Sequence, residues 1–177
     1  MKVYVTGRKG GTGKTIVALY LMYRLKIMGF RVEFKDLSDN GIGGNYLKKI
    51  GFRRDPKPHY IIYDIKPSAI DGSQDLTILV TEFPFIKLET WDWPTKKILV
   101  LNKANPFPDK FIQQLEQIKS LVPEFDHVVV VPFNGFLFNG ELTSEPVLDK
   151  LGLIVAGKAN DKLVLPFVEE AGRTTIY

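Results

Sequence analysis

The sequence predicts an α/β fold, with helices flanking a mostly parallel, twisted β-sheet, on three observations. Short apolar runs of strand length alternate along the chain with segments of helical periodicity. Several of these runs are apolar throughout, as parallel strands are when helices cover both faces of their sheet. The chain has 177 residues, which is enough for one domain with a sizeable core. We therefore expect a single domain over residues 1–177.

Six apolar runs rich in β-branched residues are the expected strands. They cover residues 3–6, 32–34, 60–63, 76–80, 98–101 and 128–131. Their alternation with helical segments implies right-handed crossovers and a parallel sheet. Residues 39–58 are loop-like, with one expected helical turn around 46–50. Near the end of the chain, 153–156 and 163–168 could both be strands, or one of them could be a helix.

Two segments have clear helical patterns. The first covers residues 14–28, directly after the first expected strand and its glycine-rich loop. The second covers 109–122, where the apolar residues fall on one stripe. In this second helix, Asp109 is the expected N-cap and Pro123 ends the segment.

The composition narrows the class of protein. With 24 Lys+Arg against 20 Asp+Glu, the formal charge is +4, which permits contact with nucleic acid or anionic lipid without requiring it. The absence of Cys excludes disulfides, thiolate metal sites and cysteine-bound iron–sulfur clusters. No apolar run is long enough to span a bilayer, and the first residues lack a signal-peptide pattern. We therefore expect a cytoplasmic protein without a membrane span.

A phosphate-binding loop follows the first expected strand. Residues 8–15 read RKGGTGKT, in which three glycines let successive backbone N–H groups point into one concavity. The N-terminus of the helix that follows would favour negative charge at the same place. Lys14 can then reach the β- and γ-phosphates of a nucleotide, and the Thr15 hydroxyl can ligate Mg²⁺. The residues expected to bind the nucleotide here are Gly10, Gly11, Thr12, Gly13, Lys14, Thr15 and Ile16.

Two acidic residues follow apolar runs whose carboxyl ends should meet near this loop. Asp64 follows the run 60–63, where a carboxylate would hold Mg²⁺. Asp36 follows the run 32–34, where it could position an attacking water or join the Mg²⁺ shell. Thr15, Asp36 and Asp64 are therefore the expected metal-site residues.

The strict phosphate-loop pattern asks for glycine at position 8, where this chain has Arg8. The variant KGGTGKT instead resembles the loop of the ParA/MinD family of P-loop ATPases, of the SIMIBI type, whose signature is the early lysine, here Lys9. Residues 60–68, YIIYDIKPS, look like the family's strand followed by D-x-P-P-S. Residues 36–41 are similar to its D-x-D switch segment, with Ser38 at the second acidic position.

This resemblance implies an Mg²⁺-dependent ATPase that forms a homodimer with ATP at the interface, together with an activating partner protein. Lys9 would reach the γ-phosphate of the partner's ATP, although it could also be a solvated loop lysine. Lys9, Lys14 and Asp36 are thus the expected catalytic residues. Ser38, and a segment between Asp36 and Asp64 that is shorter than in typical partition ATPases, imply slow hydrolysis.

The base is expected to be adenine. The run 98–101 leads into N-K-A-N, whereas guanine-binding proteins carry N-K-x-D, whose carboxylate accepts two guanine donors. Asn105 replaces that aspartate, and a neutral amide is a poorer double acceptor. By the family resemblance, the adenine would be lined by Asn102, Pro132, Phe133 and Asn134. The plainer alternative for the N-K pair is an ordinary polar strand end.

By the same resemblance, the expected role is DNA partitioning, with non-specific DNA binding by the ATP-bound dimer. The basic stretch, defined as Lys48, Lys49, Arg53, Arg54 and Lys57, could track DNA phosphates, although such runs are often only a solvated surface. One alternative is a MinD-like positioning regulator, but residues 167–177 are a poor match for the amphipathic helix it needs. The others are a nucleotide-binding scaffold with little ATPase activity and a small phosphotransferase. Trp91 and Trp93 could anchor an interface or pack on the domain's own core.

Overall fold

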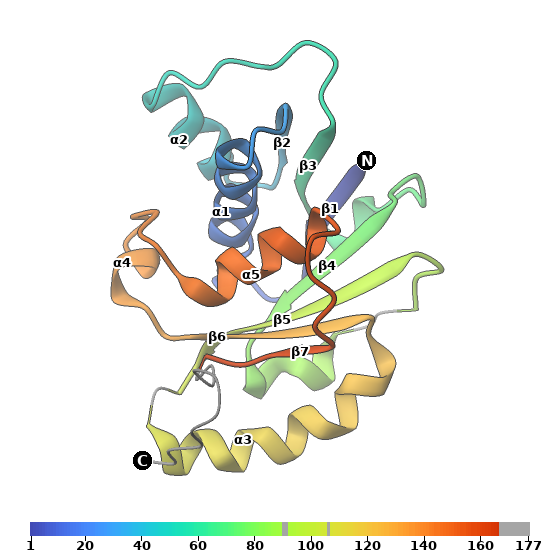
Figure 1. Cartoon of the computed structure of the whole chain (residues 1–177), viewed down its shortest axis with the longest axis vertical. Coiled ribbons are helices and arrows are strands. Elements are labelled where there is room, and N and C mark those ends of the chain that lie inside the picture. The colour runs from blue at the N-terminus through green and yellow to red at the C-terminus, as the bar shows by residue number, and fades with distance from the viewer. Residues whose placement is uncertain (90–91, 106, 167–177) are drawn as a thin grey trace.

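Seven parallel strands form one sheet in the computed structural model, which describes residues 1–89, 92–105 and 107–166 (Figure 1). The spatial order is β2-β3-β1-β4-β5-β6-β7, and every neighbouring pair is parallel. The strands are β1 (Lys2–Thr6), β2 (Val32–Leu37), β3 (Tyr60–Ile65), β4 (Leu76–Thr81), β5 (Lys96–Ala104), β6 (His127–Pro132) and β7 (Leu163–Val164). The predicted α/β class and its six predicted strands are confirmed.

Helices cover both faces of this sheet. The α-helices are α1 (Lys14–Ile27), α2 (Ile42–Lys49), α3 (Pro108–Leu121), α4 (Gly135–Phe138) and α5 (Pro146–Val155). Three short 3₁₀ turns are η1 (Pro67–Ala69), η2 (Phe83–Leu88) and η3 (Val122–Glu124). In Figure 1, α1 and α5 lie on one face of the sheet and α3 lies on the other.

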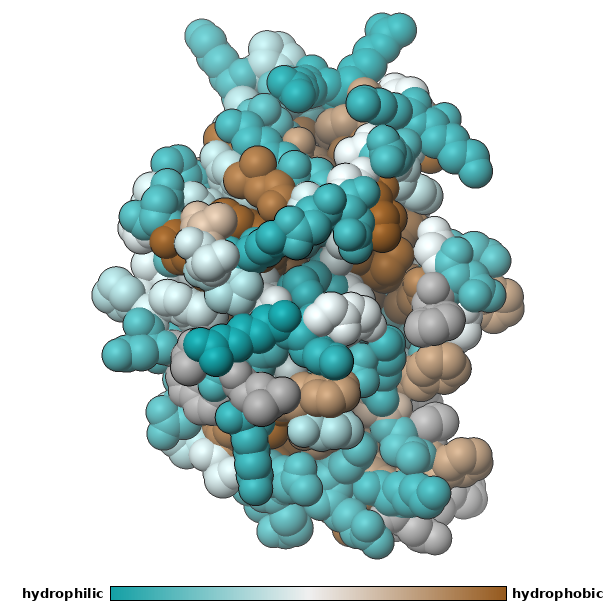
Figure 2. Space-filling model, turned by 180° about the vertical axis from the view of Figure 1, so that it is seen from behind, coloured by the Kyte–Doolittle hydropathy of each residue, from teal (hydrophilic) through white to brown (hydrophobic). Residues whose placement is uncertain are grey.

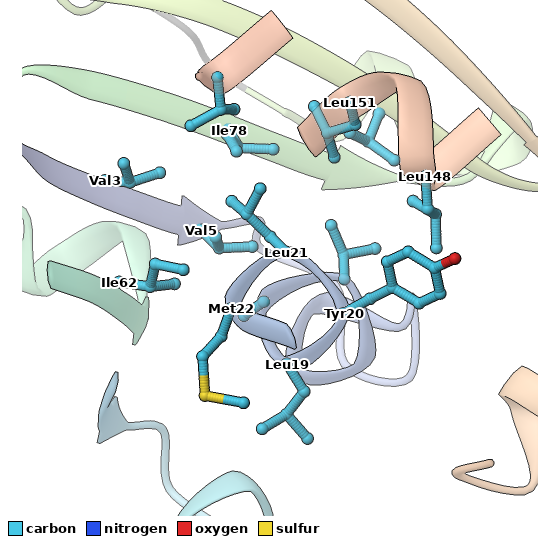
Figure 3. Packing of buried hydrophobic residues seen from close by; sticks show 14 of the residues in the cluster. Val3, Val5, Leu19, Tyr20, Leu21, Met22, Ile62, Ile78, Leu148 and Leu151 are labelled. Carbon is cyan, nitrogen blue, oxygen red and sulfur yellow. The ribbon is translucent and has the colours of Figure 1, made fainter. Parts of the chain in front are cut away.

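The strand side chains divide between two hydrophobic clusters, as the pleat of a strand requires. In β5, Ile98 and Val100 belong to the cluster under α1 and α5, whereas Leu99 and Leu101 belong to the cluster under α3. Figure 3 shows the first cluster, where side chains of α1 and α5 converge with those of β1, β3 and β4. Burial of both faces explains why these runs are apolar throughout rather than alternating.

Predicted boundaries differ from the structure in several places, and each of the six predicted strands extends beyond its apolar run by at least one residue. Helix α3 begins at Pro108 with Phe107 as its N-cap, so the prediction of Asp109 as N-cap was wrong. Proline suits this first position because it lacks the N–H that the helix start would leave unpaired. Helix α2 has eight residues rather than one turn. Of the ambiguous end segments, 153–155 lies in α5 and 163–164 forms β7, while 167–168 falls outside the described residues.

The topology brings the expected site residues to one edge of the sheet. Strand β1 lies between β3 and β4. Strands β2 and β3 lie on one side of β1, and the later strands β4 to β7 lie on the other side, so the strand order reverses at β1. In open α/β sheets, ligands bind at such a reversal, outside the carboxyl ends of the strands. The loop from β1 to α1 lies there. Asp36 and Asp64 are register partners on the neighbouring strands β2 and β3.

Candidate functional site

Two glycines in the connection from β1 to α1, Gly7 and Gly13, could not be replaced by another residue without strain. Gly13 has φ 87°, and a Cβ there would lie 2.4 Å from Asn102 Nδ2. A Cβ on Gly7 would lie 2.3 Å from the Val80 carbonyl oxygen of β4. By contrast, a Cβ on Gly10 would meet nothing within 4 Å. Gly7 and Gly13 therefore fix the path of the loop at its two ends, while Gly10 stands at its open tip.

A cavity of about 1050 Å³ opens above this loop at the carboxyl edge of the sheet. Ten of the eleven residues predicted to bind nucleotide line it: Gly10, Gly11, Gly13, Lys14, Thr15, Ile16, Asn102, Pro132, Phe133 and Asn134. Thr12 is fully buried beneath the loop, where its hydroxyl donates to the carbonyl oxygens of Lys9 and Val80 at 3.3 Å each. The structure thus brings the loop and the ends of β5 and β6 to one chamber.

Lys14 is held against the loop from which it projects. Its Nζ donates to the Lys9 carbonyl oxygen at 2.7 Å. Burial lowers the pKa of Lys14, while the nearby carboxylates of Asp64 and Glu89 act in the opposite direction. An ammonium group that is partly desolvated and faces a concavity lined by N–H groups is well placed to bind an anion.

Thr15 and Asp64 meet at the start of α1. The Thr15 hydroxyl donates to Asp64 Oδ2 at 2.5 Å, and Asp64 is 0% exposed. Burial raises the pKa of Asp64, and the hydrogen bond from Thr15 partly offsets this. The other carboxylate oxygen, Oδ1, has no hydrogen-bond partner among the described residues. A buried carboxylate oxygen without a partner, beside a hydroxyl, is the kind of donor set that a hard divalent cation takes.

This pair fits Mg²⁺ only with help from other oxygens. Within the described part of the chain, no group of three or more His, Cys, Asp or Glu side chains could hold a metal ion. Mg²⁺ is commonly held by one or two protein groups together with substrate phosphates and water, so a phosphate in the cavity would complete the shell. The residues present therefore fit Mg²⁺ as a nucleotide-dependent ion and do not fit a permanently bound metal.

Asp36 organises the start of α2 and does not line the cavity. Its Oδ1 accepts hydrogen bonds from the backbone N–H and the hydroxyl of Ser38, and its Oδ2 accepts from Gly44 N–H at 2.8 Å. Gly43 and Gly44 leave room for this carboxylate, because a Cβ on Gly43 would lie 3.2 Å from Asp36 Oδ2. Ser38 itself does line the cavity. The segment 38–41 is therefore the part of the switch-like region that faces the chamber.

Lys9 is exposed and also lies outside the cavity lining. Its Nζ lies 5.1 Å from the centroid of the Phe85 ring in η2, a cation–π contact. Its backbone carbonyl accepts the hydrogen bond from Lys14 described above. In this structure Lys9 thus contributes its backbone to the loop while its side chain packs outside.

The end of β5 is irregular, and the irregularity ties it to the loop. A register shift against β6 falls between Leu101 and Ala104, and Lys103 has φ 54°. As a result, Asn102 Nδ2 donates to the Thr12 carbonyl at 2.8 Å, and Lys103 Nζ donates to the Gly11 carbonyl at 2.6 Å. Lys103 also pairs with Glu82 at 2.8 Å. A bulge commonly re-aims side chains next to a site, and here it makes the N-K pair a clamp on the phosphate loop.

Asn134, predicted to line adenine, and Asn105, at the position of the guanine-binding aspartate, already have hydrogen-bond partners. Asn134 caps α4, with Oδ1 accepting from Phe136 N–H at 3.0 Å and Leu137 N–H at 3.3 Å, while its Nδ2 donates to Glu145 at 3.1 Å. Asn105 Oδ1 accepts from Phe107 N–H at 2.9 Å. The ring of Phe133 is 49% exposed and lines the chamber. Stacking on Phe133, rather than amide recognition, is what this end of the cavity offers to a flat ring.

Sequence reasoning missed several residues of the chamber. Lys66 and Asp39 both line it and form an ion pair, and Trp93 also lines it, whereas Trp91 lies outside the described residues. The buried carboxylate of Glu89 accepts the Arg8 N–H at 3.0 and 3.1 Å. One signal was available for Lys66, because it stands where D-x-P-P-S has its first proline. Glu89 carried no such signal, since it belongs to no motif.

No protein-family model matches the chain, and no curated protein matches it. Solved structures do. A nucleotide-binding protein in complex with ADP, from Archaeoglobus fulgidus, matches with a TM-score of 0.52 and 13% identity, over 90% of this chain and 89% of that one. A chain of the MinC:MinD cell division protein complex from Aquifex aeolicus matches with a TM-score of 0.53 and 14% identity, over 90% and 97%. At such low identity these matches show a shared fold, the α/β fold of P-loop proteins.

None of the helices in the described part of the chain is long and apolar enough to cross a membrane.

Proposed function

We propose that this protein binds ATP with Mg²⁺ in the cavity above the phosphate loop and hydrolyses it slowly. One observation carries the proposal: the Thr15–Asp64 pair, with its unpartnered buried carboxylate oxygen, lies at the mouth of a preformed glycine loop. Buried polar groups without partners are uncommon in native proteins, and such a group at a phosphate loop is well explained by a cation that arrives with the nucleotide. The fold shared with an ADP-bound nucleotide-binding protein supports the same conclusion.

The chemistry follows from the positions of the side chains. The loop N–H groups and Lys14 would bind the β- and γ-phosphates, and Lys14 would leave the Lys9 carbonyl to do so. Thr15 and Asp64 would hold Mg²⁺, which when bound neutralises charge on the phosphate oxygens. Adenine would stack on Phe133, between the ends of β5 and β6.

Asp36 would position the attacking water. Its oxygens accept hydrogen bonds from Ser38 and from Gly44 in the first turn of α2, so this role requires the start of α2 to rearrange. The same observation favours a second candidate function, a nucleotide-binding scaffold with little ATPase activity. Single-turnover hydrolysis with Asp36→Asn would separate the two functions. An unchanged slow rate would favour the scaffold, and a loss of the rate would favour the water-positioning role.

We further propose that ATP joins two copies of the chain and that the dimer acts as a switch, as in ParA-like or MinD-like proteins. Lys9 would leave the Phe85 ring and reach the partner's γ-phosphate. Two such lysines would repel each other unless nucleotide lay between them, so the dimer would depend on ATP. DNA partitioning with non-specific DNA binding, and an activating partner protein, belong to the same proposal. The exposed basic stretch supports the DNA contact.

Calorimetry with Mg²⁺-ATP and Mg²⁺-GTP tests the central claim. We expect ATP to bind more tightly, and we expect Lys14→Ala to abolish binding of both nucleotides. Lys96→Ala is the matched control, because Lys96 is an exposed lysine at the opposite end of β5. Tighter binding of GTP would contradict the adenine assignment. Absence of binding of either nucleotide to the wild-type protein would contradict the proposed function itself.

Light scattering after size exclusion tests the switch. With saturating ATP we expect a dimer that reverts to monomer with ADP, and we expect Lys9→Ala to weaken it. A protein that stays monomeric under saturating ATP would argue against the dimer while leaving nucleotide binding intact.

A further inference from the structure

We propose that Lys66 is a phosphate-contacting residue of this chamber, acting within its own chain, and that Asp39 holds it when no terminal phosphate is bound. The inference rests on the proposed function, because the phosphate in question is the γ-phosphate of bound ATP. It goes further by naming a group that would distinguish ATP from ADP.

The backbone brings Lys66 to the metal end of the chamber. Lys66 lies two residues after Asp64, whose carboxylate accepts the Thr15 hydroxyl. Its φ of −75° and ψ of 151° are extended, and Pro67 follows it as the first residue of η1. A residue before proline is restricted to this region, so the direction in which Lys66 leaves the backbone is fixed. Two extended residues span roughly 7 Å. The four-carbon side chain of Lys66 is long enough to reach back over this distance toward Asp64.

Asp39 and Lys66 join two walls of the chamber. Asp39 belongs to the segment 38–41 after β2, and Lys66 belongs to the segment after β3; both line the cavity and their charged groups are paired. Their side chains are 70% and 46% exposed, respectively. Exposed ion pairs contribute little to stability, so a terminal phosphate with up to two negative charges would compete well for the lysine.

The other lysines of the chamber wall have partners that belong to the loop itself. Lys14 donates to the Lys9 carbonyl and Lys103 donates to the Gly11 carbonyl, so both already stabilise the loop. Lys66 instead pairs with an exposed carboxylate of the neighbouring segment 38–41, which is not part of the loop. Among the lysines of the described residues that line the chamber, Lys66 is therefore the one that a phosphate could recruit with the least disturbance of the loop.

Movement of Lys66 to a phosphate would also change the contacts at the start of α2. Asp39 follows Ser38, whose hydroxyl and N–H bind Asp36, and α2 begins after Gly41, whose φ is 58°. Release of Asp39 from Lys66 would remove the ion pair between this segment and the residue that follows β3. The terminal phosphate would thus be sensed at the start of the helix that carries Lys48 and Lys49.

Calorimetry with Mg²⁺-ADP and with a non-hydrolysable Mg²⁺-ATP analogue tests the proposal on the full chain. Lys66→Ala should weaken the triphosphate analogue by about tenfold, the usual loss for one charge-assisted contact, and leave ADP within about twofold. Lys66→Arg should restore most of the triphosphate affinity. Asp39→Asn should strengthen triphosphate binding by about two- to threefold, because it removes the competitor for Lys66. Lys96→Ala again serves as the exposed-lysine control.

Equal weakening of both nucleotides by Lys66→Ala, or of neither, would overturn the proposal. An effect seen only in samples that light scattering shows to be dimeric would overturn the assignment within one chain. Thermal unfolding of each variant checks that the folded state is retained. We expect this because the side chains of Lys66 and Asp39 are exposed. If the wild-type protein binds neither nucleotide, the proposed function has failed rather than this inference.

Discussion

The phosphate loop and the segment 38–41 line the same chamber, but they are held in different ways. The loop is fixed by contacts from three other elements: the carbonyls of Gly11 and Thr12 bind the end of β5, Thr12 binds β4, and Arg8 N–H binds the buried Glu89 after η2. The segment 38–41 depends on one carboxylate, Asp36, and on the exposed Asp39–Lys66 pair. We call the loop the preformed wall and the segment 38–41 the responsive wall, because fewer of the described contacts hold the second.

The largest effect on stability and nucleotide affinity should come from Gly13→Ala, which alters the phosphate loop. The new Cβ would be strained at φ 87° and would lie 2.4 Å from Asn102 Nδ2, so the clamp from β5 would have to open. We expect a loss of about 2–3 kcal/mol in the free energy of unfolding and of at least about 100-fold in nucleotide affinity. Denaturant unfolding and calorimetry measure the two effects.

Gly10→Ala is the matched control for this loop. A Cβ at that position meets nothing within 4 Å, and its φ is not positive. We expect a change in the free energy of unfolding of less than about 0.5 kcal/mol. If the two glycine variants behaved alike, the account of the loop as a clamped structure would be wrong.

The responsive wall is tested by Asp36→Ala, which removes three hydrogen bonds to Ser38 and Gly44. We expect a loss of about 1–2 kcal/mol in local stability, because the Gly44 N–H in the first turn of α2 loses its acceptor. Hydrogen exchange of the amides of residues 38–44 should accelerate while those of the loop and β1 stay protected. Uniform acceleration across the sheet would show that the two walls are not independent.

A further variant, Asp64→Asn, should change the free energy of unfolding and the affinity for nucleotide in opposite directions. Since burial raises the pKa of Asp64, the folded nucleotide-free protein binds its proton more tightly than the unfolded chain does. Stability contributed by this group therefore falls as pH rises from the unfolded to the folded pKa. At pH 7, Asp64→Asn should raise the free energy of unfolding by about 0.5–2 kcal/mol and weaken Mg²⁺-dependent ATP binding.

Denaturant unfolding at two pH values, one below the unfolded pKa of Asp64 and one at pH 8, checks the sign of this effect. The stabilisation by Asp64→Asn should be larger at pH 8. A variant that is less stable than wild type at both values would show that Asp64 is held by contacts the structure lacks.

The smallest expected effect concerns the basic stretch beyond the responsive wall. Long hydrophilic side chains project from the end of the molecule where α2 and the following segment lie (Figures 1 and 2), and all five basic residues are exposed. Lys48→Glu with Lys49→Glu should weaken ATP-stimulated DNA binding and lower the slope of log affinity against log salt by about two. Gel shifts at two salt concentrations measure this, with Lys96→Glu as control. An unchanged slope would mean that the stretch is a solvated surface.

Much of the fold could be predicted because it depends on local pattern. Both faces of the sheet are buried, so its strands can be identified in the sequence as apolar runs. Strand β7 has two residues and α2 contains two glycines, so neither has a strong local signature. Helix α2 forms because Asp36 binds its first turn and Leu47 packs into the core, both of which are tertiary effects.

Part of the candidate site was predictable in its residues, but the contacts of those residues were not. The sequence motif placed Lys14 and Thr15, and strand ends placed Asp64. The engagement of Asn102 depends on a bulge, and that of Asn134 depends on a helix that begins beside it. Neither irregularity follows from periodicity, so the expectation that these two amides would be available to adenine could not be checked without coordinates.

The bulge at the end of β5 has a consequence for anyone who sets out to re-engineer the base preference. Asn102 and Lys103 already match the first two residues of the guanine-binding pattern N-K-x-D, and replacement of either would remove a donor from the Thr12 or Gly11 carbonyl. A change at these two positions would therefore alter the phosphate loop as well as the base end of the cavity. Phe133 directly follows β6 and lines the same chamber, so it is a position at which stacking on a base could be altered.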